Sequence, residues 1–95
     1  MIDQALLQQQ QKRLTALQDV LEQEFAALKQ RQVIELAELA NKKTVLLTQL
    51  TALDEQARQN ASADEYQSWR ENLHDLLRSC REKNEVNGKL IEMNL

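Results

Sequence analysis

The chain has 95 residues, which is enough for one small domain or one extended helical element. It contains one Gly and no Pro, and 28% of its residues are charged. Because strands and tight turns depend on Gly and Pro, this composition argues against an all-β or α/β fold. The abundance of Leu, Gln, Ala and Glu favours long helices or a coiled coil.

The formal net charge of −3 offers no electrostatic basis for binding nucleic acid or an anionic membrane. The longest apolar run is Phe25-Ala26-Ala27-Leu28, which is too short for a membrane span or the core of a signal peptide. Cys80 is the single cysteine and therefore forms no intramolecular disulfide. We expect a cytoplasmic protein with no nucleic-acid partner and no membrane insertion.

Residues 5–31 are predicted to form the first helix, because leucines recur every seven residues along it. Two further apolar residues, Leu17 and Phe25, widen this stripe. The repeating residues are Leu7, Leu14, Leu21 and Leu28.

Residues 33–60 are predicted to form the second helix. Its apolar positions alternate in spacings of three and four, as in a heptad seam, with one lysine among them. These positions are Leu36, Leu39, Lys43, Leu46, Leu50, Leu53 and Ala57.

The seam of the second helix resumes one residue out of phase with the first, after the polar run Lys29-Gln30-Arg31-Gln32. A shift of one residue rotates the apolar face by roughly 100° on a continuous helix. We therefore predict a tight turn here and an antiparallel hairpin, with leucines of the two helices packed together. The alternative is one unbroken helix that pairs between molecules.

A third helix is predicted over residues 63–95. Ser62 and Glu65 have the spacing of a capping box, which marks a helix start. We expect an all-α fold of three long antiparallel helices, a coiled-coil-like hairpin or bundle with the shape of a rod. Trp69 is expected to be mostly buried near the connection between the first two helices.

No catalytic constellation can be assembled from this sequence. His74 and Cys80 lie on different sides of a helix, and a metal site would require two or more further ligands at helical spacing. The nearby carboxylates, Glu71 and Asp75, are better interpreted as solvated surface. An all-helical mutase would need cations from separate helices to converge on one cavity. Arg13, Arg31 and Lys42-Lys43 are the candidates for that role, but each has ordinary surface alternatives. We predict no enzyme activity, no metal and no cofactor.

Lys43 interrupts the leucine seam of the second helix. The favoured interpretation is that its aliphatic stem packs on the seam while the ammonium group reaches solvent at the edge. The alternative is a bond to a carboxylate on another helix, which would fix the register.

Near the C-terminus, Asn84, Asn87 and Gly88 lower helix propensity among the apolar residues Val86, Leu90 and Ile91. Core packing alone does not require this combination. The Gly could permit a close helix approach or a hinge. We predict that these six residues form a partner-binding site.

The sequence resembles the FlgN family of flagellar export chaperones in three stretches. The first two, Leu21–Leu28 and Leu36–Leu53, are general helical patterns, the second containing Lys42-Lys43. The third, Asn84-x-x-Asn87-Gly88-x-Leu90-Ile91, is similar to the family's NxxNGxLL signature and is more specific. Together the three stretches span most of the chain, in the family's order, and the resemblance implies that residues 1–95 form one FlgN-like helical domain.

The resemblance implies a cytoplasmic chaperone that binds hook–filament junction (hook-associated) proteins, keeps them from assembling early and delivers them to the flagellar export apparatus. Its expected partners are those proteins and components of the export gate or its ATPase. Family members continue beyond the Asn-Gly signature into a segment associated with substrate binding. Since this sequence ends at Leu95, we expect either a short variant or a sequence without its tail. The alternative function is a structural coiled-coil subunit that forms a homodimer or larger assembly.

The apolar end of the third helix could be exposed or buried. It comprises Val86, Leu90, Ile91, Met93 and Leu95. It could remain exposed as an interaction site. It could instead pack against Leu6 and Leu7 at the start of the first helix.

Overall fold

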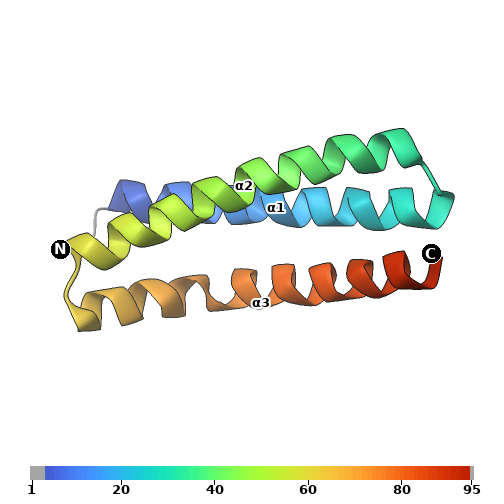
Figure 1. The fold of residues 1–95 in the computed structure, drawn as a ribbon. Coiled ribbons are helices and arrows are strands. Elements are labelled where there is room, and N and C mark those ends of the chain that lie inside the picture. Colours follow the sequence, from blue (N-terminus) through green and yellow to red (C-terminus); the bar gives the residue numbers. More distant parts are fainter. Residues whose placement is uncertain (1–3, 95) are drawn as a thin grey trace.

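A computed structural model describes residues 4–94, which form three helices in an elongated rod (Figure 1). Helix α1 spans Gln4–Gln30, α2 spans Val33–Asn60 and α3 spans Ala63–Asn94, and these residues include no strand. The all-α prediction is confirmed, with each predicted boundary within one residue of the observed one. The rod measures 46 × 19 × 16 Å, and consecutive helices run antiparallel, so that α1 and α3 are parallel.

The predicted break between the first two helices is a tight turn at Arg31 and Gln32. The Gln32 N–H donates to the carbonyl of Ala27 at 2.9 Å, and the Arg31 N–H donates to that of Leu28 at 3.3 Å. These two bonds form a Schellman motif, and Arg31 adopts its left-handed conformation with a φ of 57°. The turn excludes the continuous helix, and α2 folds back along α1.

The predicted capping box begins α3. The Glu65 N–H donates to Ser62 Oγ at 3.2 Å, and the Ser62 N–H donates to Glu65 Oε1 at 3.3 Å. Two backbone donors at the helix start are satisfied in this way. The cap thereby defines where α3 begins after the connection from α2.

Ser62→Ala removes the Oγ acceptor, so we expect it to lower the free energy of unfolding by about 1 kcal/mol. Urea unfolding followed by circular dichroism measures this difference. Ser68→Ala, at an exposed position inside α3, is the matched control and should be neutral or slightly stabilising. An equal loss in both variants would contradict the capping role.

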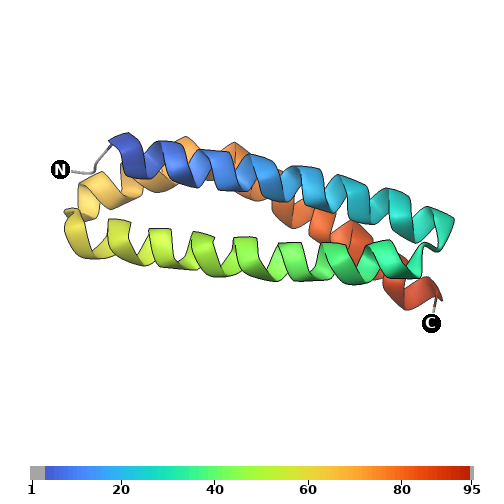
Figure 2. The same cartoon turned by 90° about the horizontal axis from the view of Figure 1, so that it is seen from above.

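The core follows α1, which packs against both other helices, whereas α2 and α3 share few contacts. Figure 2 shows α1 and α2 running along each other, with α3 crossing behind them. The predicted seam is confirmed for most of its leucines, although Leu36 and Leu46 are only partly buried. Phe25 differs from the prediction, because it lies at the edge of the stripe and is 39% exposed. The main cluster contains Leu14, Leu17, Leu21, Leu50, Ala57, Trp69, Leu73 and Cys80.

Trp69 is 2% exposed, so its predicted burial is confirmed. Its predicted place near the α1–α2 turn is wrong. Helix α3 begins at the opposite end of the rod, beside the α2–α3 connection, and Trp69 lies within its first two turns (Figure 1). There it belongs to the main cluster, together with Ala57 and Leu73.

Trp69→Ala should cost about 3–5 kcal/mol of stability, because a large side chain is removed from a packed core. Thermal unfolding followed by circular dichroism should show a melting temperature several degrees lower or more. Phe25→Ala removes an aromatic ring that is partly exposed, and its effect should be much smaller. An unchanged melting temperature for Trp69→Ala would contradict its place in the core.

Candidate protein-interaction site

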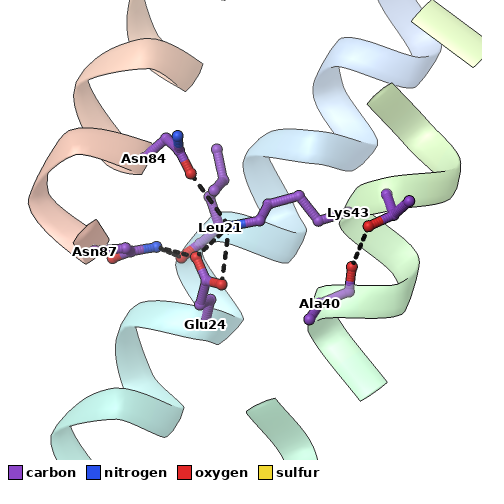
Figure 3. Close-up of polar contacts among 7 residues, drawn as sticks. Leu21, Glu24, Ala40, Lys43, Asn84 and Asn87 are labelled. Atoms are coloured by element: carbon purple, nitrogen blue, oxygen red, sulfur yellow. Dashed lines mark hydrogen bonds and ion pairs between the residues drawn. The ribbon is translucent and has the colours of Figure 1, made fainter. Parts of the chain in front are cut away.

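A buried carboxylate on α1 connects the three helices (Figure 3). Glu24 is 4% exposed. Lys43 Nζ, from α2, donates to its two carboxylate oxygens at 3.0 and 3.2 Å. Asn87 Nδ2, from α3, donates to Glu24 Oε1 at 2.8 Å. Burying a charge is costly unless it is paired and hydrogen-bonded, and these contacts meet both conditions.

The two asparagines of the C-terminal signature lie on the face of α3 that joins this network. Asn87 Nδ2 also donates to the backbone carbonyl of Leu21 at 2.9 Å, and Asn87 is 2% exposed. Asn84 Oδ1 accepts a hydrogen bond from Lys43 Nζ at 3.2 Å. A spacing of three residues places both amides on one helix face. The signature therefore attaches the second half of α3 to α1 and α2.

The favoured interpretation of Lys43, an ammonium group that reaches solvent, is wrong. The side chain is 23% exposed, and its ammonium group binds the buried carboxylate of Glu24. The seam position of Lys43 faces α1 at the level of Glu24, where the carboxylate requires a cation. The alternative, a bond to a carboxylate on another helix, is the one observed.

Glu24→Ala removes the counter-ion of Lys43 and one of the two acceptors of Asn87, so we expect a loss of about 2–3 kcal/mol in the free energy of unfolding. Lys43→Met with Glu24→Leu replaces the ion pair by apolar groups of similar size and should restore most of this loss. Urea unfolding of Glu24→Leu, of Lys43→Met and of the double variant measures the coupling energy between the two residues. Additive effects would contradict a direct interaction.

The six residues predicted as a partner-binding site have different environments in the structure. Asn87 is bonded inside the bundle, and Asn84 is exposed but bonded to Lys43. An added Cβ at Gly88 would meet nothing within 4 Å, and α3 is continuous there, so a close helix approach does not explain this Gly. The three apolar residues reach solvent to different degrees: Val86 is 48% and Ile91 40% exposed, while Leu90 is half-buried.

Val86 borders a hollow between α1 and α3, of about 300 Å³. Its walls are mainly apolar, with Phe25 contributed by α1 and Val86 by α3. The Lys83–Glu22 ion pair, at 3.5 Å, joins two of its lining residues. The hollow is lined by Leu21, Glu22, Phe25, Glu82, Lys83, Val86 and Asn87. We call it the α1–α3 hollow.

Sequence reasoning missed the α1 side of this hollow, because Phe25 continued the apolar stripe and was assigned to the core. The sequence did contain one signal, which is that Lys29 follows Phe25 by one helical turn. In the structure, Lys29 Nζ is 5.2 Å from the centroid of the Phe25 ring. A cation over an aromatic face is typical of a surface ring.

The apolar end of α3 does not pack against the start of α1. Leu6 and Leu7 border the main cluster at the other end of the rod. Because α1 and α3 are parallel, the end of α3 lies at the same end of the rod as the α1–α2 turn, away from Leu6 and Leu7 (Figure 1). Met93 is 80% exposed, and Leu95 lies outside the described residues.

The described residues contain no cluster of three His, Cys, Asp or Glu side chains that could hold a metal. The Cys80 thiol is buried and donates to the carbonyl of Leu14 at 3.6 Å. Burial raises the pKa of this thiol, so the nucleophilic thiolate is disfavoured.

The cations considered for a mutase-like site do not share a cavity. Arg31 lies in the α1–α2 turn. Arg13 is distant along α1 and donates to Gln49 at 3.2 Å. Lys43 is bound to Glu24.

No described helix carries an apolar stretch of the length that a bilayer requires.

The fold and the exposed apolar surface are those of an elongated helical binding protein. The chain belongs to the FlgN family: the family profile described as FlgN protein matches residues 4–95. FlgN proteins form a chaperone family, and this chain is accordingly a flagellar export chaperone that binds flagellar proteins. Searches of curated proteins and of solved structures found no match.

Proposed function

We propose that this chaperone binds hook–filament junction proteins in the cytoplasm, keeps them from assembling prematurely and delivers them to the export apparatus. Its proposed binding residues are Val86, Leu90 and Ile91 at the end of α3, together with Phe25, which lines the α1–α3 hollow with Val86. The observation that carries the proposal is that Phe25, Val86 and Ile91 are exposed in this helical chain of the FlgN family.

The surface has the chemistry that an amphipathic helix requires. Its centre is apolar, because Val86 and Phe25 border the hollow, and charged residues such as Glu22, Glu82 and Lys83 surround it. An apolar centre within a polar rim is typical of protein interfaces. A helix that buries its apolar face here can no longer use that face to assemble.

The buried network supports this surface from behind. Asn87, one residue from Val86, is held by Leu21 and Glu24 of α1. The two helices that carry the apolar residues are thus fixed to each other. A preformed surface lowers the entropy cost of binding.

The alternative function, a coiled-coil subunit assembled through the α2 seam, is less well supported. That assembly would use leucines of α2 between molecules. Leu39, Leu50 and Leu53 are already buried within one chain. The exposed apolar residues at the end of α3 are the better candidates for an intermolecular contact.

Truncating Val86 and Ile91 together to Ala should weaken binding of a hook-associated protein fragment by about 2–4 kcal/mol, as for interface hot spots. Isothermal titration calorimetry of the full chain measures the affinity. Both side chains are substantially exposed, so far-ultraviolet circular dichroism should stay nearly the same.

Val45→Ala is the matched control for Val86→Ala, since Val45 is an exposed valine on α2, 55% exposed against 48% for Val86. It should leave the affinity unchanged. Equal affinities of the wild type and the Val86/Ile91 variant would contradict the assignment of the surface. A wild type that binds no hook-associated fragment would contradict the proposed cargo.

A further inference from the structure

A second recess lies between α2 and α3, on the side where these two helices share few contacts. We call it the α2–α3 groove. Its volume is about 450 Å³, and leucines of α1 form its base. Unlike the α1–α3 hollow, it has α2 as one wall. It is lined by Gln10, Leu14, Leu17, Leu21, Lys43, Leu47, Leu50, Thr51, Asp54, Arg70, Leu77, Cys80, Arg81 and Asn84.

The walls of the groove carry apolar surface that the chain leaves uncovered. Leu47, on α2, is 48% exposed, and Leu77 faces the groove from α3 and is half-buried. The α3 wall runs from Arg70 to Asn84, which corresponds to roughly 20 Å, or four helical turns. A helix of about 15 residues matches this length.

The groove is positively charged although the chain is acidic. Its lining contains three cations, Lys43, Arg70 and Arg81, and one carboxylate, Asp54. Lys43 is bound to Glu24, and Arg70 lies 3.7 Å from Asp54. The Arg81 side chain is exposed and has no hydrogen-bond or ion-pair partner among residues 4–94. An occupant with a carboxylate at this edge would complement the charge.

One buried acceptor in the groove is also unpartnered. Gln10 is 4% exposed, and its Oε1 atom accepts no hydrogen bond from the described residues. A buried polar atom without a partner is costly. A donor brought by an occupant could satisfy it.

We propose that the α2–α3 groove binds an amphipathic helix of a partner protein, with carboxylates along one edge of the apolar face. The helix completes a four-helix bundle on Leu47, Leu50 and Leu77, and one of its carboxylates pairs with Arg81. A second copy of this chain fits poorly, because a twofold contact of groove on groove would oppose two positively charged surfaces. The assignment is independent of the cargo surface at the end of α3.

The test uses two synthetic, fluorescently labelled 15-residue peptides and the full chain. Both peptides have Leu along one helix face; one carries Glu at the flanking positions and the other carries Lys. Fluorescence anisotropy should show binding of the Glu peptide at least about tenfold tighter than that of the Lys peptide. Because the contacts are partly exposed, the difference should shrink at high salt.

Arg81→Glu should weaken binding of the Glu peptide by about tenfold. Lys12→Glu, an equal charge change at an exposed residue outside the groove, should leave its affinity within about twofold. The Val86/Ile91 variant should bind the Glu peptide like the wild type, which separates this site from the cargo surface.

Three results would overturn the proposal. The first is equal binding of both peptides, or none of the Glu peptide, by the wild type. The second is an equal loss of affinity in Arg81→Glu and Lys12→Glu. The third is self-association in sedimentation velocity that Arg81→Glu abolishes, which would assign the groove to a second copy.

Discussion

The arrangement of the three helices depends on the ion pair and the hydrogen bonds that the Glu24 carboxylate makes. This carboxylate is buried on the central helix and receives hydrogen bonds from Lys43 of α2 and from Asn87 of α3. Leucine seams bury apolar area at several nearby registers, because their contacts are not directional. A buried ion pair stabilises little in net terms, but it penalises a register in which the charge loses its partners.

This network explains why the end of α3 can be both fixed and exposed. Asn87 is held inside, whereas Val86, one residue earlier, points to the α1–α3 hollow. Ile91, one turn beyond Asn87, remains accessible to solvent. A chaperone that covers an amphipathic helix needs apolar surface that does not collapse into its own core, and these contacts provide it.

The central position of α1 has a second consequence. Since α1 packs against both neighbours while α2 and α3 share few contacts, the bundle has an open side. A four-helix bundle would fill this side with another helix. The unpaired Arg81 at its edge indicates the charge that such a helix should carry.

The fold was largely predictable from the sequence, because the heptad spacing and the capping box at Ser62 are local signals. The hairpin was predictable from the phase shift after Leu28. The roles of single residues were harder to predict, because they depend on which helices meet. Lys43 could be assigned to Glu24 only once α1 and α2 were in register, and Asn87 required the parallel packing of α3.

The candidate site was predictable only in part. The exposure of Val86 and Ile91 agrees with a partner surface, whereas Asn87 faces inward. Phe25 lies four residues after Leu21 and three before Leu28, so it was assigned to the apolar stripe and its exposure was missed. A ring at the edge of an apolar stripe can be buried or exposed, and the packing of the neighbouring helix decides which.

Hydrogen–deuterium exchange of the full chain, with and without a hook-associated protein fragment, tests most directly whether the end of α3 and the facing part of α1 bind cargo. The account predicts that the fragment slows amide exchange in residues 82–93 and 22–29, with little change in the middle of α2. Slower exchange confined to α2, with residues 82–93 unaffected, would contradict it.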